Sequence, residues 1–235
     1  MREIALSPMA EKRKYRLQRK RLVEELHERG IDDENVLRAI AAVPRHEFVE
    51  PALRNRAYRD EALPIGKRQT ISQPFTVAYQ SMLLEVQPGD RVLEVGTGSG
   101  YQAAVLCELG ARVFTIERHR PLLDRAVDIL EQLDYRVVSR VGDGTLGWQS
   151  FAPYDGIVVT AAAADVPQPL LEQLRLPDDD TPGGRLVVPV GTQDGQVMMR
   201  ITRTGQESFE REGFHRFRFV PLVGAEGGLE HPEAS

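Results

Sequence analysis

The sequence predicts an α/β protein built on a doubly wound, mostly parallel sheet. From residue 91 to residue 190, short apolar runs alternate with segments of helix-forming composition, the order expected of repeated strand–helix units. The first run, 91–95, leads directly into the glycine-rich sequence GTGSG and then into a helical pattern. A second run ends in the acid Glu117, at the edge where parallel sheets bind their ligands.

Composition bounds the possible functions. A chain of 235 residues suits one α/β domain with additions, and its net charge of −5 argues against general affinity for nucleic acid. The single cysteine, Cys107, falls in an apolar helical pattern, so we expect a core residue and no disulfide. No apolar run approaches the ~20 residues that span a membrane, and no signal peptide is visible, which predicts a cytoplasmic protein without a membrane partner.

The sequence pattern predicts helices in the N-terminal part of the chain. Residues 22–30 form an amphipathic pattern closed by Gly30, and Asp32 or Asp33 is placed to cap a second helix that stops before Pro44. Two small helices suggest a subdomain that extends to about residue 80. A basic cluster precedes them, and we interpret it as a solvated helix face or frayed extension in preference to a nucleic-acid contact. Its members are Lys12, Arg13, Lys14, Arg16, Arg19, Lys20 and Arg21.

The polar loop 66–74, GKRQTISQP, precedes a helix expected over 75–84. Thr70, Ser72 and Gln73 place hydrogen-bonding groups on this loop, but composition alone favours a turn that caps the next helix. His46, upstream, is expected to pack or to hydrogen-bond structurally. No second His or Cys lies at ligand spacing from it, so we predict no metal site.

The stretch RVLEVGTGSG, residues 91–100, is the centre of the predicted ligand site. A buried strand, a turn with Gly96, Gly98 and Gly100, and a helix N-terminus together expose backbone N–H groups to an anionic or polar ligand. The glycine spacing departs from the dinucleotide pattern GxGxxG, because the third glycine comes one residue early. With Glu94 before the turn, the block resembles motif I of the class I S-adenosylmethionine-dependent methyltransferases, although an NAD-binding site stays open at this point.

Two further acids fall at the same edge of the sheet. Glu117 lies 19 residues after Gly98, close to where nucleotide-binding folds place the carboxylate that accepts ribose hydroxyls. Asp143, between two glycines after the strand 136–141, is placed to reach an adenine amine or simply to form a turn. These convergent features favour a nucleotide-type cofactor.

The rest of the chain completes seven predicted strands. A fourth strand is expected over 154–160 and a fifth over 184–190, with a helix at 167–174 between them. The short link GTQDG makes the strand 196–205 an antiparallel hairpin partner of the fifth. We place the last strand at 214–223 and expect the tail 225–235 to be disordered.

With these segments in hand, the sequence resembles the protein-L-isoaspartate O-methyltransferases. VPRHEFV, LPIG, QTISQP, VLEVGTGSGYQ, GDG, YDGIVVTAAA, LVVPVG and FVPLV occur in that family's order and spacing, from about residue 22 to residue 224. QTISQP joined to this motif I is more specific than any glycine pattern, and it reverses the preference for a simple capping turn in the loop 66–74.

The resemblance implies a seven-stranded Rossmann-like methyltransferase sheet and an N-terminal helical subdomain. We divide the chain into a basic extension (1–21), a helical subdomain with the active-site loop (22–80), an S-adenosylmethionine-binding domain (81–224) and the tail (225–235). The implied reaction methylates the free α-carboxylate of L-isoaspartyl residues in damaged proteins. The ester then closes to a succinimide, which hydrolyses partly to normal aspartate.

Site residues are carried over from the family's motifs. Ser72 matches the catalytic serine, with Thr70, Ile71, Gln73 and Val220 on the substrate side. The cofactor-binding positions are Glu94, Gly96, Thr97, Gly98, Ser99, Gly100, Glu117, Arg118, Asp143 and Gly144. A carboxylate acceptor is already ionised at neutral pH and needs no general base, so Ser72 is expected to orient it. The expected partners are isoaspartyl proteins and peptides, not nucleic acid, and the expected state is a monomer.

Two other functions are compatible with part of this sequence. A methyltransferase of the same fold that acts on a small molecule or nucleic acid would share the cofactor site, but it leaves QTISQP unexplained. A catalytically silent binding module would not require the intact Ser72 loop. A dehydrogenase function is disfavoured, because the third glycine is displaced from the dinucleotide pattern and no residues for nicotinamide chemistry are visible.

Overall fold

The computed structural model describes residues 8–192 and 194–227. Its centre is a seven-stranded sheet with the strand order β5-β4-β3-β6-β7-β8-β9. The strands are β3 (Arg91–Val95), β4 (Arg112–Glu117), β5 (Val137–Val141), β6 (Gly156–Val159), β7 (Arg185–Thr192), β8 (Gly195–Arg203) and β9 (Phe209–Phe217). β3 to β7 run parallel to one another, and β8 is antiparallel to both of its neighbours. The predicted mostly parallel sheet and its β7–β8 hairpin are confirmed.

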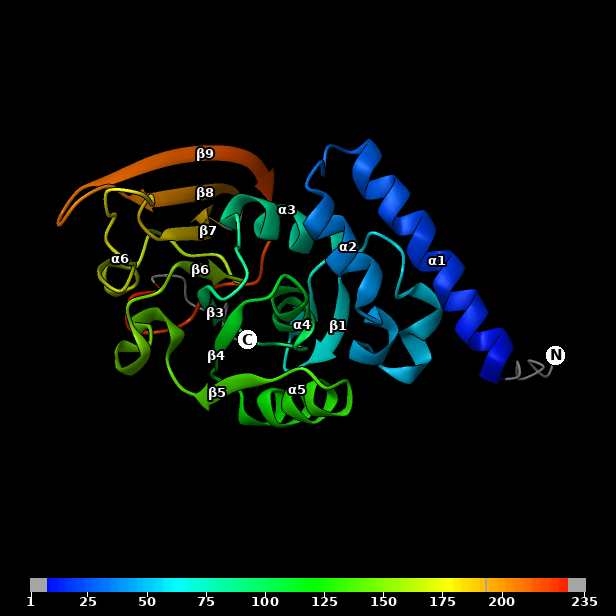
Figure 1. Ribbon diagram of the computed structural model, residues 1–235. Coiled ribbons are helices and arrows are strands. Elements are labelled where there is room, and N and C mark those ends of the chain that lie inside the picture. The colour runs from blue at the N-terminus through cyan, green and yellow to red at the C-terminus, as the bar shows by residue number, and fades with distance from the viewer. Residues whose placement is uncertain (1–7, 193, 228–235) are drawn as a thin grey trace.

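Helices cover both faces of this sheet (Figure 1). One face packs against α3 (Pro74–Leu84), α4 (Tyr101–Glu108) and α5 (Arg120–Gln132). The other packs against α6 (Gln168–Glu172) and the short 3-10 helices η3 (Gly144–Leu146) and η4 (Gln149–Phe151). Side chains of β3 alternate between the two cores, Val92 in the first and Leu93 and Val95 in the second. The carboxyl ends of the central strands therefore meet at one edge.

The N-terminal helices form a further layer over α3 and α4, on the side away from the sheet (Figure 1). These are α1 (Pro8–Glu28), α2 (Glu34–Ala42), and the 3-10 helices η1 (Arg45–Phe48) and η2 (Pro51–Arg56). Asp33 caps α2, accepting hydrogen bonds from Asn35 N–H (2.8 Å) and Val36 N–H (3.2 Å). The packing role expected of His46 is confirmed, since its ring stacks on Tyr15 at 3.9 Å and its Nδ1 lies 2.6 Å from Tyr58 Oη.

The first helix begins earlier than the sequence pattern predicted. We expected its start at Leu22, but α1 runs without a break from Pro8, so the whole basic cluster lies on a regular helix. From residue 13 on, its buried positions are widely spaced, at Tyr15, Leu22 and Leu26, and basic residues surround the first of them. Because apolar residues are so sparse on this face, the sequence pattern did not indicate where the helix begins. Residues 1–7 lie outside the described part of the chain.

The loop 66–74 also differs from the simple turn favoured by its composition. It belongs to a hairpin of β1 (Leu63–Gly66) and β2 (Gln69–Ile71), whose turn residues Lys67 and Arg68 have φ of 51° and 58°. Helix α3 is capped from elsewhere, because the Asp60 carboxylate accepts the Phe75 N–H at 2.7 Å. The Ser72 hydroxyl is therefore not used as the cap.

The last strand was placed wrongly by the sequence. β9 ends at Phe217, not at Val223, and residues 218–227 leave the sheet as a segment that we call the C-terminal strap (Figure 1, orange to red). Pro221 of the strap pairs with Ala162 beyond the end of β6. Ala225 to Gly227, expected in a disordered tail, form an ordered turn on Asp143, and 228–235 lie outside the described residues.

Three smaller findings concern the described residues. None of their helices is long and apolar enough to cross a membrane. No three His, Cys, Asp or Glu side chains among them gather closely enough to hold a metal ion. Cys107 packs partly buried against the core, as expected, and burial together with nearby acids raises the pKa of its thiol to about 12, so it is unreactive.

Candidate active site

The glycine turn lies at the carboxyl end of β3. The N–H groups of Gly96 and Thr97 donate to the Ile116 carbonyl of β4, at 2.8 and 3.3 Å, which anchors the turn to the sheet. Gly96 has φ +97°, and a Cβ there would lie 2.4 Å from Thr160 Oγ1. The turn thus needs glycine for its backbone shape and for its close approach to the end of β6.

Glu117, at the end of β4, is held by the same turn. Its Oε2 accepts the Gly98 N–H at 2.9 Å and its Oε1 accepts the His119 N–H at 2.8 Å. Two backbone donors fix the plane of the carboxylate, while each oxygen keeps capacity for a second hydrogen bond. This geometry suits a carboxylate that receives the two hydroxyls of a ribose.

Glu94 is completely buried beneath the turn. Thr115 Oγ1 donates to its Oε2 at 2.6 Å, and because that proton is used, Thr97 Oγ1 must donate to Thr115 Oγ1 at 2.5 Å. Its other oxygen, Oε1, has no partner among the described residues, although Glu94 lines the cleft. A buried carboxyl oxygen without a protein partner fits a ligand group that pairs with it, such as the amino group of S-adenosylmethionine, which can replace the proton of the carboxyl group.

Burial raises the pKa of Glu94 to about 8, against a hydrogen bond from Thr115 that lowers it. The folded protein therefore holds a proton on Glu94 that the unfolded chain releases near its ordinary pKa of 4.5. We expect the free energy of unfolding to fall as pH rises from about 5 to 8, by about 1.4 kcal/mol for each unit between the two pKa values.

Glu94→Gln, which cannot ionise, removes this contribution. Urea unfolding of the ligand-free protein at pH 5, 6.5 and 8 measures it: the wild type should lose stability across this window more steeply than the variant. Equal slopes in the two proteins would show that Glu94 does not hold the proton.

The Asp143 carboxylate accepts a hydrogen bond from the backbone of the C-terminal strap. Its Oδ2 accepts the Ala225 N–H at 2.7 Å, and its Oδ1 accepts the Thr145 N–H and hydroxyl at 2.9 and 2.7 Å. Burial alone would raise the pKa of Asp143, but these hydrogen bonds outweigh it and hold the pKa below its ordinary value. Asp143 therefore joins the strap to the end of β5, and it does not itself line the cofactor cleft, although its neighbour Gly144 does.

The site consists of two connected hollows. The cofactor cleft lies between the glycine turn, the end of β4, the β2 loop and the strap. A second hollow of about 450 Å³, which we call the acceptor groove, lies between the N-terminal layer and the end of β9. Both hollows are lined by Thr70, Ser72, Thr160 and Val220. Ser72 thus stands where the two meet, directly before α3.

The structure brings most of the predicted site residues together. Those that line the cofactor cleft are Thr70, Ile71, Ser72, Glu94, Gly96, Thr97, Gly98, Ser99, Glu117, Arg118, Gly144 and Val220. Gln73 lines only the acceptor groove. Gly100 lines neither hollow; a Cβ there would contact Ala126 and Leu130 of α5 at 3.3 Å, so its small size serves helix packing.

Several lining residues were not singled out from the sequence. They are Gln69, Val77, Tyr101, Gln102, Ile116, His119, Thr160, Ala161, Pro221, Leu222 and Val223, among others. Thr160 and Ala161 follow a predicted parallel strand at its carboxyl end, so position alone could have indicated them. The strap residues gave no such signal, because they read as part of a strand.

A parallel sheet of this order, with a glycine turn after its central strand and an acid after the next, defines a Rossmann-like S-adenosylmethionine-dependent methyltransferase. A family model described as Protein-L-isoaspartate(D-aspartate) O-methyltransferase (PCMT) matches residues 17–227. The chain therefore belongs to that family, and the resemblance stated from the sequence is confirmed.

Individual proteins agree with this assignment. The chain is 66% identical over 220 residues to the protein-L-isoaspartate O-methyltransferase of Salinibacter ruber, covering 92% of this chain and 96% of the relative. A solved protein-L-isoaspartate O-methyltransferase matches with TM-score 0.77 and 29% identity, over 89% of this chain and 67% of its own. A Plasmodium falciparum structure in complex with S-adenosyl-L-homocysteine matches with TM-score 0.72 over 87% of this chain and 98% of its own; its 23% identity shows the shared fold.

Proposed function

We propose that this enzyme transfers a methyl group from S-adenosylmethionine to the free α-carboxylate of L-isoaspartyl residues in damaged proteins and peptides, which starts their repair through a succinimide. Family membership supports the reaction. The observation that ties it to this chain is the position of Ser72, at the junction of a cofactor cleft and a groove open to a second substrate.

On the cofactor side, the residues present fit S-adenosylmethionine. Glu117 would receive the ribose hydroxyls, the glycine turn would border the amino acid part, and the unpartnered Oε1 of Glu94 would accept from its amino group. Asp143 and Gly144 would border the adenine, and Thr97, Ser99 and Arg118 complete the lining. When bound, S-adenosylmethionine supplies a methyl group on a sulfonium whose departure leaves a neutral thioether.

On the acceptor side, the chain has to orient and desolvate a carboxylate. An α-carboxylate is ionised at neutral pH, so no residue needs to remove a proton. The half-buried Ser72 hydroxyl forms no hydrogen bond with any described residue and is free to donate to the acceptor. Ile71 and Val220 add apolar surface that excludes water, while Thr70 and Gln73 border the incoming peptide.

The proposal also assigns parts of the chain to these tasks. Residues 22–80 would supply the acceptor loop and residues 81–224 most of the cofactor site. We include a monomeric state, the cytoplasm as location, and neither nucleic acid nor membrane as partner. The net charge of −5 and the single cysteine support this part of the proposal.

Methyl transfer from labelled S-adenosylmethionine to a synthetic L-isoaspartyl peptide tests the reaction, with the matching aspartyl peptide as control. We expect base-labile label on the isoaspartyl peptide alone. No label on either peptide, while S-adenosylhomocysteine still binds, would reject this acceptor and leave a different methyl acceptor or a silent binding module.

A further inference from the structure

The acceptor groove contains two guanidinium groups that form no ion pair with any described residue, those of Arg216 and Arg218. Neighbouring arginines are neutralised: Arg29 pairs with Asp60, and Arg200 pairs with Glu212 at 2.7 Å. The acid among the groove's own lining residues is Asp194, which lies beyond ion-pair distance of both arginines. The groove thus presents more positive than negative charge to whatever enters it.

The backbone that bears these arginines is firmly held. They alternate with Phe217 and Phe219, and the Phe217 ring packs at 6.2 Å from Phe75 and at 5.5 Å from Tyr79. Phe219 N–H donates to Gln196 Oε1 at 2.9 Å. Both arginine side chains are exposed, and both residues border the groove, so a carboxylate that enters it can reach them.

We propose that Arg216 and Arg218 form an anionic subsite that selects isoaspartyl substrates with an aspartate or glutamate side chain close to the damaged residue. This inference rests on the proposed function, because it concerns the second substrate of the same site. The planar guanidinium offers paired N–H donors that match a carboxylate, and the groove leads from these groups to Ser72.

The expected effect is on substrate affinity and not on turnover. Both arginines remain partly in water, so each contact with a flanking carboxylate is worth only a fraction of a buried ion pair. We expect KM to be about three- to tenfold lower for a peptide with flanking glutamate than for one with flanking lysine, with similar kcat. The difference should shrink in 0.5 M salt, where the Debye length falls to about 4 Å.

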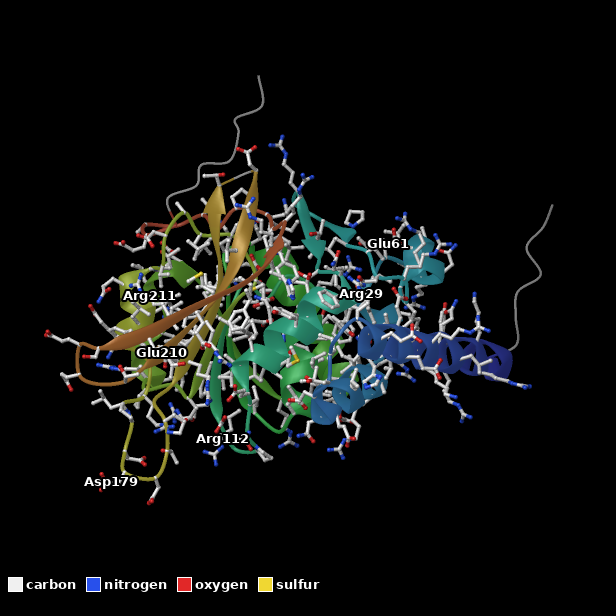
Figure 2. The ribbon with its side chains drawn as sticks, turned by 90° about the horizontal axis from the view of Figure 1, so that it is seen from above. Arg29, Glu61, Arg112, Asp179, Glu210 and Arg211 are labelled. Carbon is white, nitrogen blue, oxygen red and sulfur yellow. The ribbon has the colours of Figure 1, made fainter. Side chains whose placement is uncertain are left out.

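The test compares three isoaspartyl peptides that differ only in flanking residues, which are Glu, Gln or Lys. In the double variant Arg216→Glu/Arg218→Glu, we expect the order of KM to reverse, with the lysine peptide preferred. The matched control is Arg112→Glu/Arg211→Glu, which changes the net charge equally at exposed positions outside the groove, both set apart from Arg29 in Figure 2. The control should keep the wild-type order.

The outcomes separate the two proposals. If the wild type does not methylate the Gln peptide, the proposed function fails. If it methylates all three peptides with the same KM, or if the groove variant weakens all three equally because the arginines bind the reacting carboxylate, the flanking subsite is rejected and the function stands. Reversal in the control variant as well would assign the preference to overall charge and also reject the subsite.

Discussion

Gly96→Ala should weaken cofactor binding at least about tenfold and lower the free energy of unfolding by about 2–4 kcal/mol. The backbone at Gly96 has φ +97°, which an L side chain rarely adopts, and the new Cβ would lie 2.4 Å from Thr160 Oγ1. Thr160 cannot easily turn away, because its hydroxyl donates to the carbonyls of Val95 and Gly96 at 3.1 and 2.6 Å. The turn must shift, and its N–H groups shift with it.

Calorimetric titration with S-adenosylhomocysteine and urea unfolding measure these effects. Gly30→Ala is the matched control, since Gly30 has φ +95° but nothing within 4 Å of the added Cβ. It should carry the backbone strain of about 1–2 kcal/mol and leave cofactor affinity unchanged. Wild-type affinity in Gly96→Ala would contradict the close contact.

Testing Gly96→Ala in a Thr160→Ala variant separates the steric clash from the backbone strain. Thr160→Ala removes the atom that the new Cβ meets, so Gly96→Ala should cost less affinity in this background than in the wild type. An equal loss in both backgrounds would assign the whole effect to backbone strain. The difference between the two losses is the coupling between these positions.

The sheet could be predicted from the sequence because its signals are local. Each central strand is an apolar run bounded by turn residues, and the short link before β8 permits only a hairpin. Glu94 and Glu117 line one cleft, as expected of acids on parallel strands that share one carboxyl edge, and their role toward the cofactor stays a prediction. Nothing in these inferences needed contacts between distant residues.

The remaining features depend on distant contacts or on unusual local choices. The hairpin before Ser72 turns through Lys67 and Arg68 at positive φ, where sequence rules expect glycine or asparagine. The strap reads as a strand, but its hydrogen bonds go to Ala162 and Asp143 instead of to a neighbouring strand. Asp143 was located correctly at a strand end, yet its partner Ala225 lies 82 residues away along the chain.

Ser72→Ala should lower kcat roughly ten- to hundredfold while leaving the affinity for S-adenosylhomocysteine within about twofold of wild type. A hydrogen bond to a charged acceptor is worth about 1.5–3 kcal/mol, which converts to this range of rates if it is needed in the transition state. Since no described residue bonds to the Ser72 hydroxyl, its removal leaves no protein group unpaired, and the stability should stay near that of wild type.

Ser81→Ala is the control substitution, because it removes a serine hydroxyl that has a structural role. Its hydroxyl, buried within α3, accepts from Gln102 Nε2 at 3.0 Å, so its loss should reduce stability while kcat changes little. Single-turnover methylation of the isoaspartyl peptide and cofactor titration distinguish the two. A matching rise in cofactor Kd for Ser72→Ala would place Ser72 on the cofactor side instead of the acceptor side.

The pH profile of Ser72→Ala separates orientation from proton transfer. An orienting hydroxyl does not ionise in the working range, so the variant should keep the shape of the wild-type kcat/KM profile at a lower level. If Ser72 instead acted as a nucleophile, the variant would lose its methyl transfer almost completely, since the reaction would have no route without it. Residual activity with an unchanged profile is therefore the signature that an already ionised acceptor predicts, because positioning can be weakened without being abolished.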